Sequence, residues 1–300
     1  MTAMDKHEII SIIIPCNGRP CLRDALRSIR DSETASPYEV IVVGSLPEGY
    51  PPLTGPVRLQ PCTGLGTGAM RNLAAKQAQG DLLLFTDSDC VVDPDWIERA
   101  AVATTPDHPV VAGGLRFPES NPLDLGDNLA IFHAVHVTHS IGPARGSVGT
   151  NNLAVRRDVF DRLGGFDEDL TVGEDSEFLD RVRSAGYPVW FDPSFSVRHQ
   201  SNRNTAAQVR AHARWYAEGY CHLMTSGYLP SSFWRAEQRF GRIKGCAMLW
   251  SAIKATLGVI RVVLPHPPFW HYIRAWPTVW LFYYTRRLEL FRCLRKTKKN

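Results

Sequence analysis

The pattern of hydrophobic and polar positions alternates between two periods over residues 9–200. Strand-like apolar runs fall at 9–14, 39–43, 57–60, 81–86, 110–117 and 152–155. Segments with the apolar spacing of helices fall at 22–29, 69–79, 95–103, 123–139 and 174–185. Strands that alternate with helices predict an α/β fold, in which helices flank a sheet.

Single residues mark the ends of several predicted helices. Pro20 suits the first turn of a helix whose apolar side chains share one face, at Leu22, Ala25, Leu26 and Ile29. Gly80 and Gly186 are expected to end the helices that precede them. Phe178, Leu179 and Val182 are expected to face inward from the last of these helices.

Two carboxylates follow the apolar run at 81–86. Asp87 and Asp89 flank Ser88, so both leave the end of a buried strand, where alternate residues project to one side. Paired hard oxygen ligands suit Mg²⁺ or Mn²⁺, with the phosphates of a nucleotide completing the shell. The alternative is a solvated turn, because this short motif also occurs by chance.

A second acidic group lies at 164–181. Gly164-Gly165-Phe166-Asp167-Glu168 is followed by Gly173-Glu174-Asp175, which places Glu174 and Asp175 at the start of a predicted helix. Taken alone, acids there complement the helix dipole. The chemical alternative is a carboxylate that accepts a proton from a bound hydroxyl group.

The order of these motifs is specific. From about residue 9 to residue 200, the chain resembles the family 2 glycosyltransferases of the GT-A fold. The resemblance implies a mixed, mostly parallel sheet flanked by helices, and a helical tail is expected C-terminal to it. It also implies inverting transfer from a nucleotide-sugar donor to a glycan or lipid-linked acceptor, with UDP-sugar as the default donor and Mn²⁺ or Mg²⁺ as cofactor.

The resemblance also implies the site residues. Asp175 matches the general base, and Glu174 is expected to hydrogen bond the acceptor. The expected metal ligands are Asp87, Asp89 and His199. The expected donor-binding residues are Pro15, Asn17, Arg19, Arg71, Asn72, Asp87 and Ser88.

The chain departs from the family pattern at two positions. Gly44-Ser45 follows the second strand, where the family usually has an acidic turn that reads the base, so recognition of uracil is in doubt. GDP- and dTDP-sugars therefore remain alternatives. Met70 stands where an alanine is usual, directly before Arg71 and Asn72.

Two functions of other classes are alternatives. Gly64-Leu65-Gly66-Thr67-Gly68-Ala69 matches a dinucleotide fingerprint and favours an NAD(P)-dependent oxidoreductase, although such a loop also allows close helix packing. The second alternative is a catalytically silent GT-A module that only binds a glycan or a partner. The presence of all four acids of the two motifs argues against that module.

Composition indicates a folded chain with a large core. The 300 residues are 44% hydrophobic, and the first eight carry no apolar leader, so a cytoplasmic protein is expected. The seven cysteines form no C-x-x-C pair, which favours free thiols in a reducing compartment.

Charge separates the chain into an acidic body and a basic tail. Residues 234–300 hold 14 Lys and Arg against two acids, whereas the net charge of the first 233 residues is 20 − 28 = −8. Five of the eight tryptophans also lie in this tail. Aromatic and basic residues together favour a membrane interface over nucleic acid.

We therefore expect a catalytic domain at 1–225 and a membrane-interfacial tail at 226–300, peripheral on the inner face of the membrane. Lys254, Arg261 and Arg274 interrupt the apolar stretch, so an in-plane or re-entrant segment is expected in place of a spanning helix. The alternative is that the aromatic residues pack on the catalytic domain or on a second subunit.

Overall fold

The computed structural model describes residues 8–144, 148–225 and 270–297, together with four isolated positions between 253 and 260. Two compact units are present: Met1–Arg116 with His139–Gln200, and Phe117–Thr138 with Ser201–Asn300. The domain boundary expected at residue 225 stays a prediction, because residues 226–252 lie outside the described part. Lys254 and Arg261, around which the in-plane segment is expected, also lie outside it.

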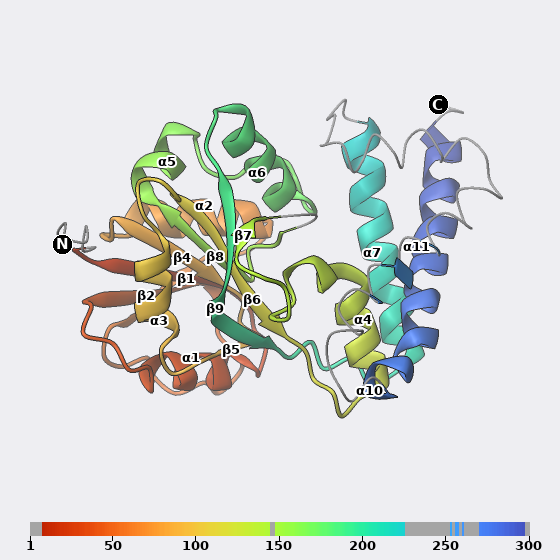
Figure 1. Cartoon of the computed structure of the whole chain (residues 1–300), viewed down its shortest axis with the longest axis horizontal. Coiled ribbons are helices and arrows are strands. Elements are labelled where there is room, and N and C mark those ends of the chain that lie inside the picture. The colour runs from red at the N-terminus through yellow and green to blue at the C-terminus, as the bar shows by residue number, and fades with distance from the viewer. Residues whose placement is uncertain are drawn as a thin grey trace. The chain divides into compact units, whose positions relative to one another are not determined.

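The first unit is built on a nine-stranded sheet with the order β3-β2-β1-β4-β8-β6-β9-β5, and β7 pairs with β9 (Figure 1). The strands are β1 Ile10–Asn17, β2 Tyr38–Ser45, β3 Val57–Pro61, β4 Leu82–Thr86, β5 Cys90–Val92, β6 Val110–Arg116, β7 Gly142–Pro143, β8 Asn152–Arg156 and β9 Val189–His199. Strands β3, β2, β1 and β4 are parallel, and β8 lies antiparallel between β4 and β6. The predicted α/β fold with a mixed sheet is confirmed.

The centre of this sheet is the most apolar part of the chain. The side chains of Ile12, Ile13 and Ile14 in β1 are fully buried, as are those of β4 from Leu82 to Phe85. Continuous apolar runs are required here because both faces of a central parallel strand are covered. The strands predicted at 9–14 and 81–86 are therefore confirmed.

Five helices belong to the first unit: α1 Leu22–Arg30, α2 Thr67–Gln77, α3 Trp96–Ala103, α5 Arg157–Arg162 and α6 Glu174–Ser184. The predicted inner face of α1 is confirmed, since its buried residues are Leu22, Ala25, Leu26 and Ile29. Gly186 has a φ of +88° beyond the end of α6, as expected of a glycine that stops a helix.

Gly80 has a different function from the predicted one. Helix α2 ends at Gln77, before this glycine. The backbone N–H of Gly80 donates a 2.8 Å hydrogen bond to Ser11 Oγ, and a Cβ atom at Gly80 would lie 2.6 Å from the Ser11 nitrogen. A glycine is therefore needed for the chain to pass close to β1, and it does not cap the helix.

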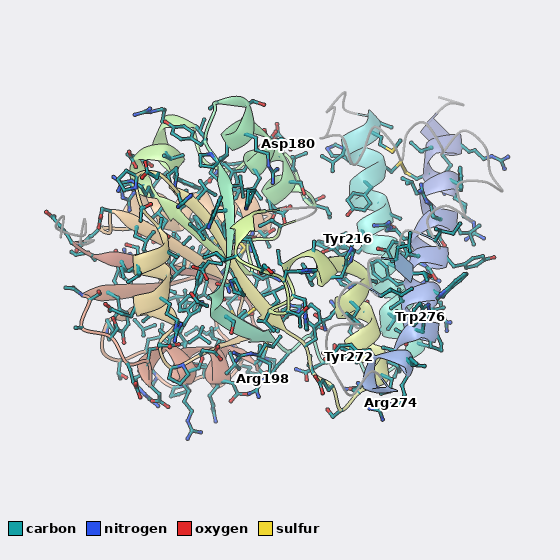
Figure 2. The ribbon with its side chains drawn as sticks, in the orientation of Figure 1. Asp180, Arg198, Tyr216, Tyr272, Arg274 and Trp276 are labelled. Carbon is teal, nitrogen blue, oxygen red and sulfur yellow. A yellow bond between two sulfur atoms is a disulfide. The ribbon has the colours of Figure 1, made fainter. Side chains whose placement is uncertain are left out.

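The second unit consists of helices: α4 Pro122–Phe132, the 3₁₀ helix η1 His133–Val135, α7 Ala206–Thr225, α10 Trp270–Ile273 and α11 Trp276–Thr297. The helix expected at 123–139 is thus shorter than predicted. Asn121 caps α4, with its side chain accepting from the Leu123 N–H. Tyr272 and Trp276 are labelled in Figure 2; Tyr272 lies in α10, and Trp276 is the first residue of α11.

Helices α7 and α11 lie side by side (Figure 1). Phe282 is fully buried and its ring lies 5.8 Å from that of His212, while Cys293 further along α11 bonds Cys221. The two helices therefore run parallel. One face of α11 packs within the chain, which is what the packing alternative for the tail expects. None of the helices in the described ranges is long and apolar enough to cross a bilayer.

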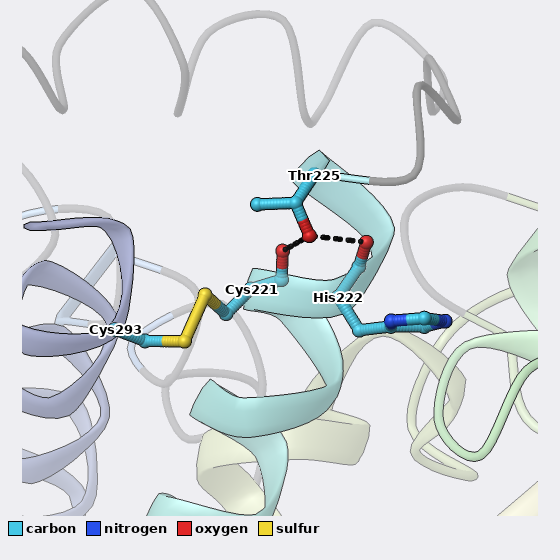
Figure 3. The surroundings of a disulfide bond; sticks show 4 residues. All are labelled: Cys221, His222, Thr225 and Cys293. Carbon is cyan, nitrogen blue, oxygen red and sulfur yellow. Dashed lines mark hydrogen bonds between the residues drawn. A yellow bond between two sulfur atoms is a disulfide. The ribbon is translucent and has the colours of Figure 1, made fainter. Parts of the chain in front are cut away.

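A disulfide joins Cys221 to Cys293, with their Cα atoms 6.2 Å apart (Figure 3). The expectation that every cysteine is a free thiol is wrong for this pair. Sequence spacing could not reveal it, because the two cysteines meet only when α11 packs against α7. The free cysteines of the described residues are Cys16, Cys21, Cys62 and Cys90.

Candidate active site

The carboxyl ends of β1 and β4 bring Arg19 and the D-x-D motif of Asp87 and Asp89 together. These strands are parallel neighbours, so the residues that follow them lie at one edge of the sheet. Arg19, which follows β1, donates from Nη1 to Asp89 Oδ2 at 3.0 Å. Asn17 is exposed at the end of β1, whereas Ser88 between the two acids is buried.

Strand β9 brings His199 to the same place. Its antiparallel register with β5 pairs Cys90 with His199, and the imidazole Nε2 lies 3.5 Å from Asp89 Oδ1. The backbone N–H of Gln200 also donates a 2.8 Å hydrogen bond to the carbonyl of Asp89. The structure therefore brings Asp89 and His199 together, although they are far apart in the sequence.

These residues form a candidate metal centre. Within the described ranges, the ligand atoms of Asp89, Cys90 and His199 lie within 4.8 Å of one another, and all three residues are buried. Carboxylate and imidazole are donors that suit Mn²⁺. Burial and the nearby Asp89 and Asp87 carboxylates raise the pKa of the Cys90 thiol well above its usual range. The residues that fit a hard divalent cation are therefore Asp89 and His199.

Asp87 faces a different partner. Its Oδ1 accepts a 2.7 Å hydrogen bond from Arg71 Nη2, and it does not belong to the three-residue cluster around Asp89. Arg71 comes from α2 and is only 3% exposed. The D-x-D motif thus directs one carboxylate toward His199 and the other toward a buried guanidinium.

Arg71 also reaches the second acidic motif. Its Nη1 donates to Glu174 Oε1 at 3.0 Å, and Thr67 Oγ1 donates to the same oxygen at 2.8 Å. A buried guanidinium needs opposite charge on more than one side to offset the loss of water, and the two carboxylates supply it. This bridge joins the end of β4 to the start of α6.

Asp175 is the neighbouring acid on α6. Its Oδ1 accepts a 2.6 Å hydrogen bond from the Ser176 N–H. Burial, and then the charge of Glu174, raise the pKa of Asp175 to about 7. A carboxylate with a pKa near neutrality is suited to accept a proton, because it is ionised at working pH and still basic enough to bind one.

Asn72 holds the Gly-Gly-Phe-Asp-Glu motif. Its Nδ2 donates to the carbonyl of Phe166 at 2.8 Å and to Glu168 Oε1 at 2.9 Å, while its Oδ1 accepts from the Phe166 N–H at 2.9 Å. A Cβ atom at Gly165 would lie 2.5 Å from Asn72 Oδ1, which explains the glycine. The donor-binding function expected of Asn72 stays a prediction.

The two departures from the family pattern, at Gly44 and Met70, lie next to each other in the structure. Gly44 has a φ of +119°, and a Cβ atom there would lie 2.2 Å from the Cys16 carbonyl oxygen and 2.6 Å from Met70 Cε. Met70 is buried, so its side chain occupies space beside Gly44. Pro15 directly precedes Cys16 and lies opposite Val43 in the β1–β2 ladder. An acidic side chain at position 44 would require this region to rearrange.

Gly68 of the dinucleotide-like loop serves packing in the structure. Helix α2 begins at Thr67, and a Cβ atom at Gly68 would lie 3.1 Å from Glu174 Cγ and 3.2 Å from the Asp167 carbonyl oxygen. Gly68 therefore allows α2 to approach the residues around the second acidic motif. This is the packing explanation that the sequence offered beside the cofactor loop.

Sequence reasoning missed Cys90 and the bridge made by Arg71. Cys90 directly follows Asp89, but its proximity to His199 depends on the register of β5 and β9. The Ala-Arg-Asn-like motif marked Arg71 as a donor residue, and no local pattern indicates its two carboxylate partners.

Comparisons with known proteins agree with this geometry. The family model "Glycosyl transferase family 2" matches residues 11–164. O-antigen biosynthesis protein RfbC of Myxococcus xanthus is 32% identical over 237 residues, which are 69% of this chain and 18% of RfbC. Glycosyltransferase AglE of Haloferax volcanii is 33% identical over 128 residues, 42% of this chain and 41% of AglE. The chain thus spans less than half of either relative.

A solved structure with a similar fold is the mannosyltransferase PcManGT from Pyrobaculum calidifontis, in complex with GDP-Man and Mn²⁺. Its TM-score is 0.61 at 18% sequence identity, and the alignment covers 95% of this chain and 87% of PcManGT. With the family model matching more than half of the chain, the protein belongs to glycosyl transferase family 2 and has the GT-A fold.

Proposed function

We propose that this protein is a metal-dependent, inverting glycosyltransferase that moves a sugar from a nucleotide-sugar donor to an acceptor hydroxyl. UDP-sugar is the default donor, and the product belongs to cell-surface glycan, glycolipid or polysaccharide synthesis. The observation that carries the proposal is the Arg71 bridge, which joins Asp87 of the donor motif to Glu174 beside Asp175. Direct transfer requires the donor and the acceptor to bind next to each other. The bridge places the donor motif beside the proposed base in this way.

The proposed reaction is a single displacement. The acceptor oxygen forms a bond to the anomeric carbon, and the bond between that carbon and the diphosphate oxygen breaks with inversion. Asp175 takes the acceptor's hydroxyl proton, for which its raised pKa suits it. Glu174 is held by Arg71 and Thr67, so it orients the acceptor and is not the base.

Asp89 and His199 are the residues proposed to hold Mn²⁺ or Mg²⁺. A divalent cation bound there supplies positive charge to the departing nucleoside diphosphate. Arg19 donates to Asp89 and, with Pro15, Asn17, Asn72 and Ser88, completes the proposed donor region. PcManGT, which has a similar fold, was solved with Mn²⁺, and this supports the choice of cation.

The names of similar proteins support the choice of donor base and of acceptor. RfbC, by its name, acts in O-antigen biosynthesis, which supports a glycan or lipid-linked acceptor. PcManGT was solved with GDP-Man, which supports a GDP-sugar as the second donor candidate. We further propose that the protein is cytoplasmic and docks on the inner face of the membrane through residues 226–300.

A thermal-shift panel tests the donor assignment. UDP-, GDP- and dTDP-sugars are each compared with and without Mn²⁺, and a ligand at about 100 times its Kd stabilises the folded state by about 2.7 kcal/mol. We expect one nucleotide class to stabilise the protein only with Mn²⁺. Stabilisation by a nicotinamide nucleotide without cation would support the oxidoreductase alternative and contradict the proposal.

The stereochemistry of the product tests the inversion step. Once the panel has named the donor, the anomeric configuration of the new linkage is compared with that of the donor by NMR. Inversion is expected. Retention would contradict a single displacement assisted by Asp175, and donor binding without transfer to any acceptor would support the silent binding module.

A further inference from the structure

The exposed positions of α11 form one stripe along the helix. Trp280 is 48% exposed and Tyr284 is 56% exposed, and Leu288 and Phe291 are partly exposed at the following turns. Spacings of four, four and three residues keep these side chains on one face of a helix. We call these four residues the aromatic stripe.

Polar and charged side chains of α11 are buried as well as apolar ones. Thr285, Arg286 and Arg287 are buried. The guanidinium of Arg286 lies 4.8 Å from the ring centre of Tyr283 and 5.3 Å from that of Tyr220. A surface helix of a soluble protein usually places its arginines outward and its aromatic side chains inward. Helix α11 thus exposes two aromatic side chains, while two of its arginines are buried beside the apolar side chains of Val279, Phe282 and Leu290.

Exposed positive charge follows the stripe. Arg292, Arg295 and Lys296, which we call the basic end, are exposed in the last turns of α11. The one acid of this helix, Glu289, is 22% exposed and pairs with Arg292 at 2.8 Å. The sequence continues with Lys298 and Lys299. Apolar aromatic side chains next to exposed cations match the interface of a bilayer that contains anionic lipid.

We propose that the aromatic stripe inserts into the headgroup region of an anionic bilayer while the basic end contacts its phosphates. This inference rests on the membrane docking proposed above and assigns it to one face of one helix. Trp and Tyr suit this position because their rings are apolar and their N–H and O–H groups can bond to headgroups and water. The charge of the basic end favours an anionic leaflet over a second copy of the same cationic surface.

Vesicle co-sedimentation of the full chain tests the stripe. The vesicles contain either phosphatidylcholine alone or phosphatidylcholine and phosphatidylserine in equal parts. The double variant Trp280→Ser, Tyr284→Ser should weaken binding to the anionic vesicles on the order of tenfold or more, because both rings leave the interface. The matched control is Val102→Ser, Ile141→Ser, which changes two apolar side chains that are 51% and 60% exposed in the first unit.

A second pair of variants tests the basic end. Arg295→Gln with Lys296→Gln should lower binding to the anionic vesicles about fivefold for each charge removed, and should not change binding to phosphatidylcholine. Arg27→Gln with Arg30→Gln removes two exposed charges from α1 and should leave binding unchanged. All variants should unfold at the temperature of the wild type, since the changed side chains are exposed.

Three results would overturn the inference. These are wild-type protein that does not pellet with either vesicle, a stripe variant that pellets like the wild type, and a wild-type dimer that the stripe variant dissociates. Donor binding and transfer to a soluble acceptor are measured on the same variants and should not change. Loss of vesicle binding with intact transfer, or the reverse, separates failure of this inference from failure of the proposed function.

Discussion

Arg71 donates a 3.0 Å hydrogen bond to the carboxylate of Glu174, which lies 103 positions later in the chain. The same guanidinium binds Asp87, so one buried cation holds the end of β4 and the start of α6 together. Because Glu174 is committed to this contact, its neighbour Asp175 is the acid that is suited to proton transfer.

Replacing Arg71 should destabilise the fold. Arg71→Ala leaves two carboxylates without their buried cation, and we expect the free energy of unfolding to fall by about 3–5 kcal/mol. Denaturant unfolding measures this change. The control is Arg58→Ala, because Arg58 is 39% exposed and its pairing with Glu39 should contribute about 0–1 kcal/mol. Equal effects of the two variants would contradict the bridging function of Arg71.

Asp175 should be needed for transfer and not for donor binding. Asp175→Asn should lower kcat by on the order of 10²-fold or more while donor affinity is retained. Asp180→Asn changes a second acid of α6, labelled in Figure 2, whose partner is Arg183, and should retain wild-type kcat. Near wild-type transfer by Asp175→Asn would exclude Asp175 as the base and leave Glu174 as the next candidate.

The raised pKa of Asp175 makes transfer depend on pH. Below about pH 7 the carboxyl is protonated and cannot accept the hydroxyl proton, so kcat should fall about tenfold per pH unit. A folded-state pKa above the unfolded value also means that Asp175 favours folding at low pH and loses this contribution as the pH rises through 7. Asp175→Asn should therefore be more stable than the wild type at pH 8. An unchanged kcat–pH profile in that variant would contradict the assignment.

Asp89 should be required for the effect of Mn²⁺ on donor binding. Asp89→Ala removes the carboxylate beside His199, so we expect the Mn²⁺-dependent part of the donor's thermal shift to vanish while the fold is retained. His199→Ala should weaken the Mn²⁺ effect. The control Asp95→Ala removes a partly exposed acid of the same unit. A variant lacking Asp89 with an unchanged Mn²⁺ requirement would show that the metal is held elsewhere.

The Cys221–Cys293 bond should stabilise the protein only under oxidising conditions. Its removal by Cys293→Ser should lower stability by about 2–4 kcal/mol without reductant and have little effect with it. Acid-quenched thiol labelling in cells then tests localisation. The proposed cytoplasmic location predicts that the pair is reduced there, and an intact disulfide in cells would contradict it.

The sequence by itself determined the elements whose burial is complete or strictly periodic. The runs in β1 and β4 are apolar at most positions because both faces are covered, and the inner face of α1 repeats with the period of a helix. The motifs around Asp87, Asp89 and Asp175 were also readable, because each is formed by residues adjacent in the chain.

Only the tertiary structure decided which distant residues meet. The pairing of β5 with β9 brings His199 to Asp89, and the approach of α6 to α2 places Glu174 on Arg71. The raised pKa of Asp175 follows from its own burial and from the charge of Glu174. Local patterns do not encode such contacts, because register and packing between distant segments produce them.

The features that the sequence predicted wrongly also depend on contacts between distant segments. Gly80 resembles a helix cap in the sequence, but a residue without a side chain is required there by the close approach of Ser11. Cys221 and Cys293 bond because α7 and α11 pack in parallel. In α11 the sequence shows mixed basic and aromatic residues, and the choice of which face is buried depends on the helices it packs against. Short-range periodicity defines a helix, whereas its buried face is decided by its partners.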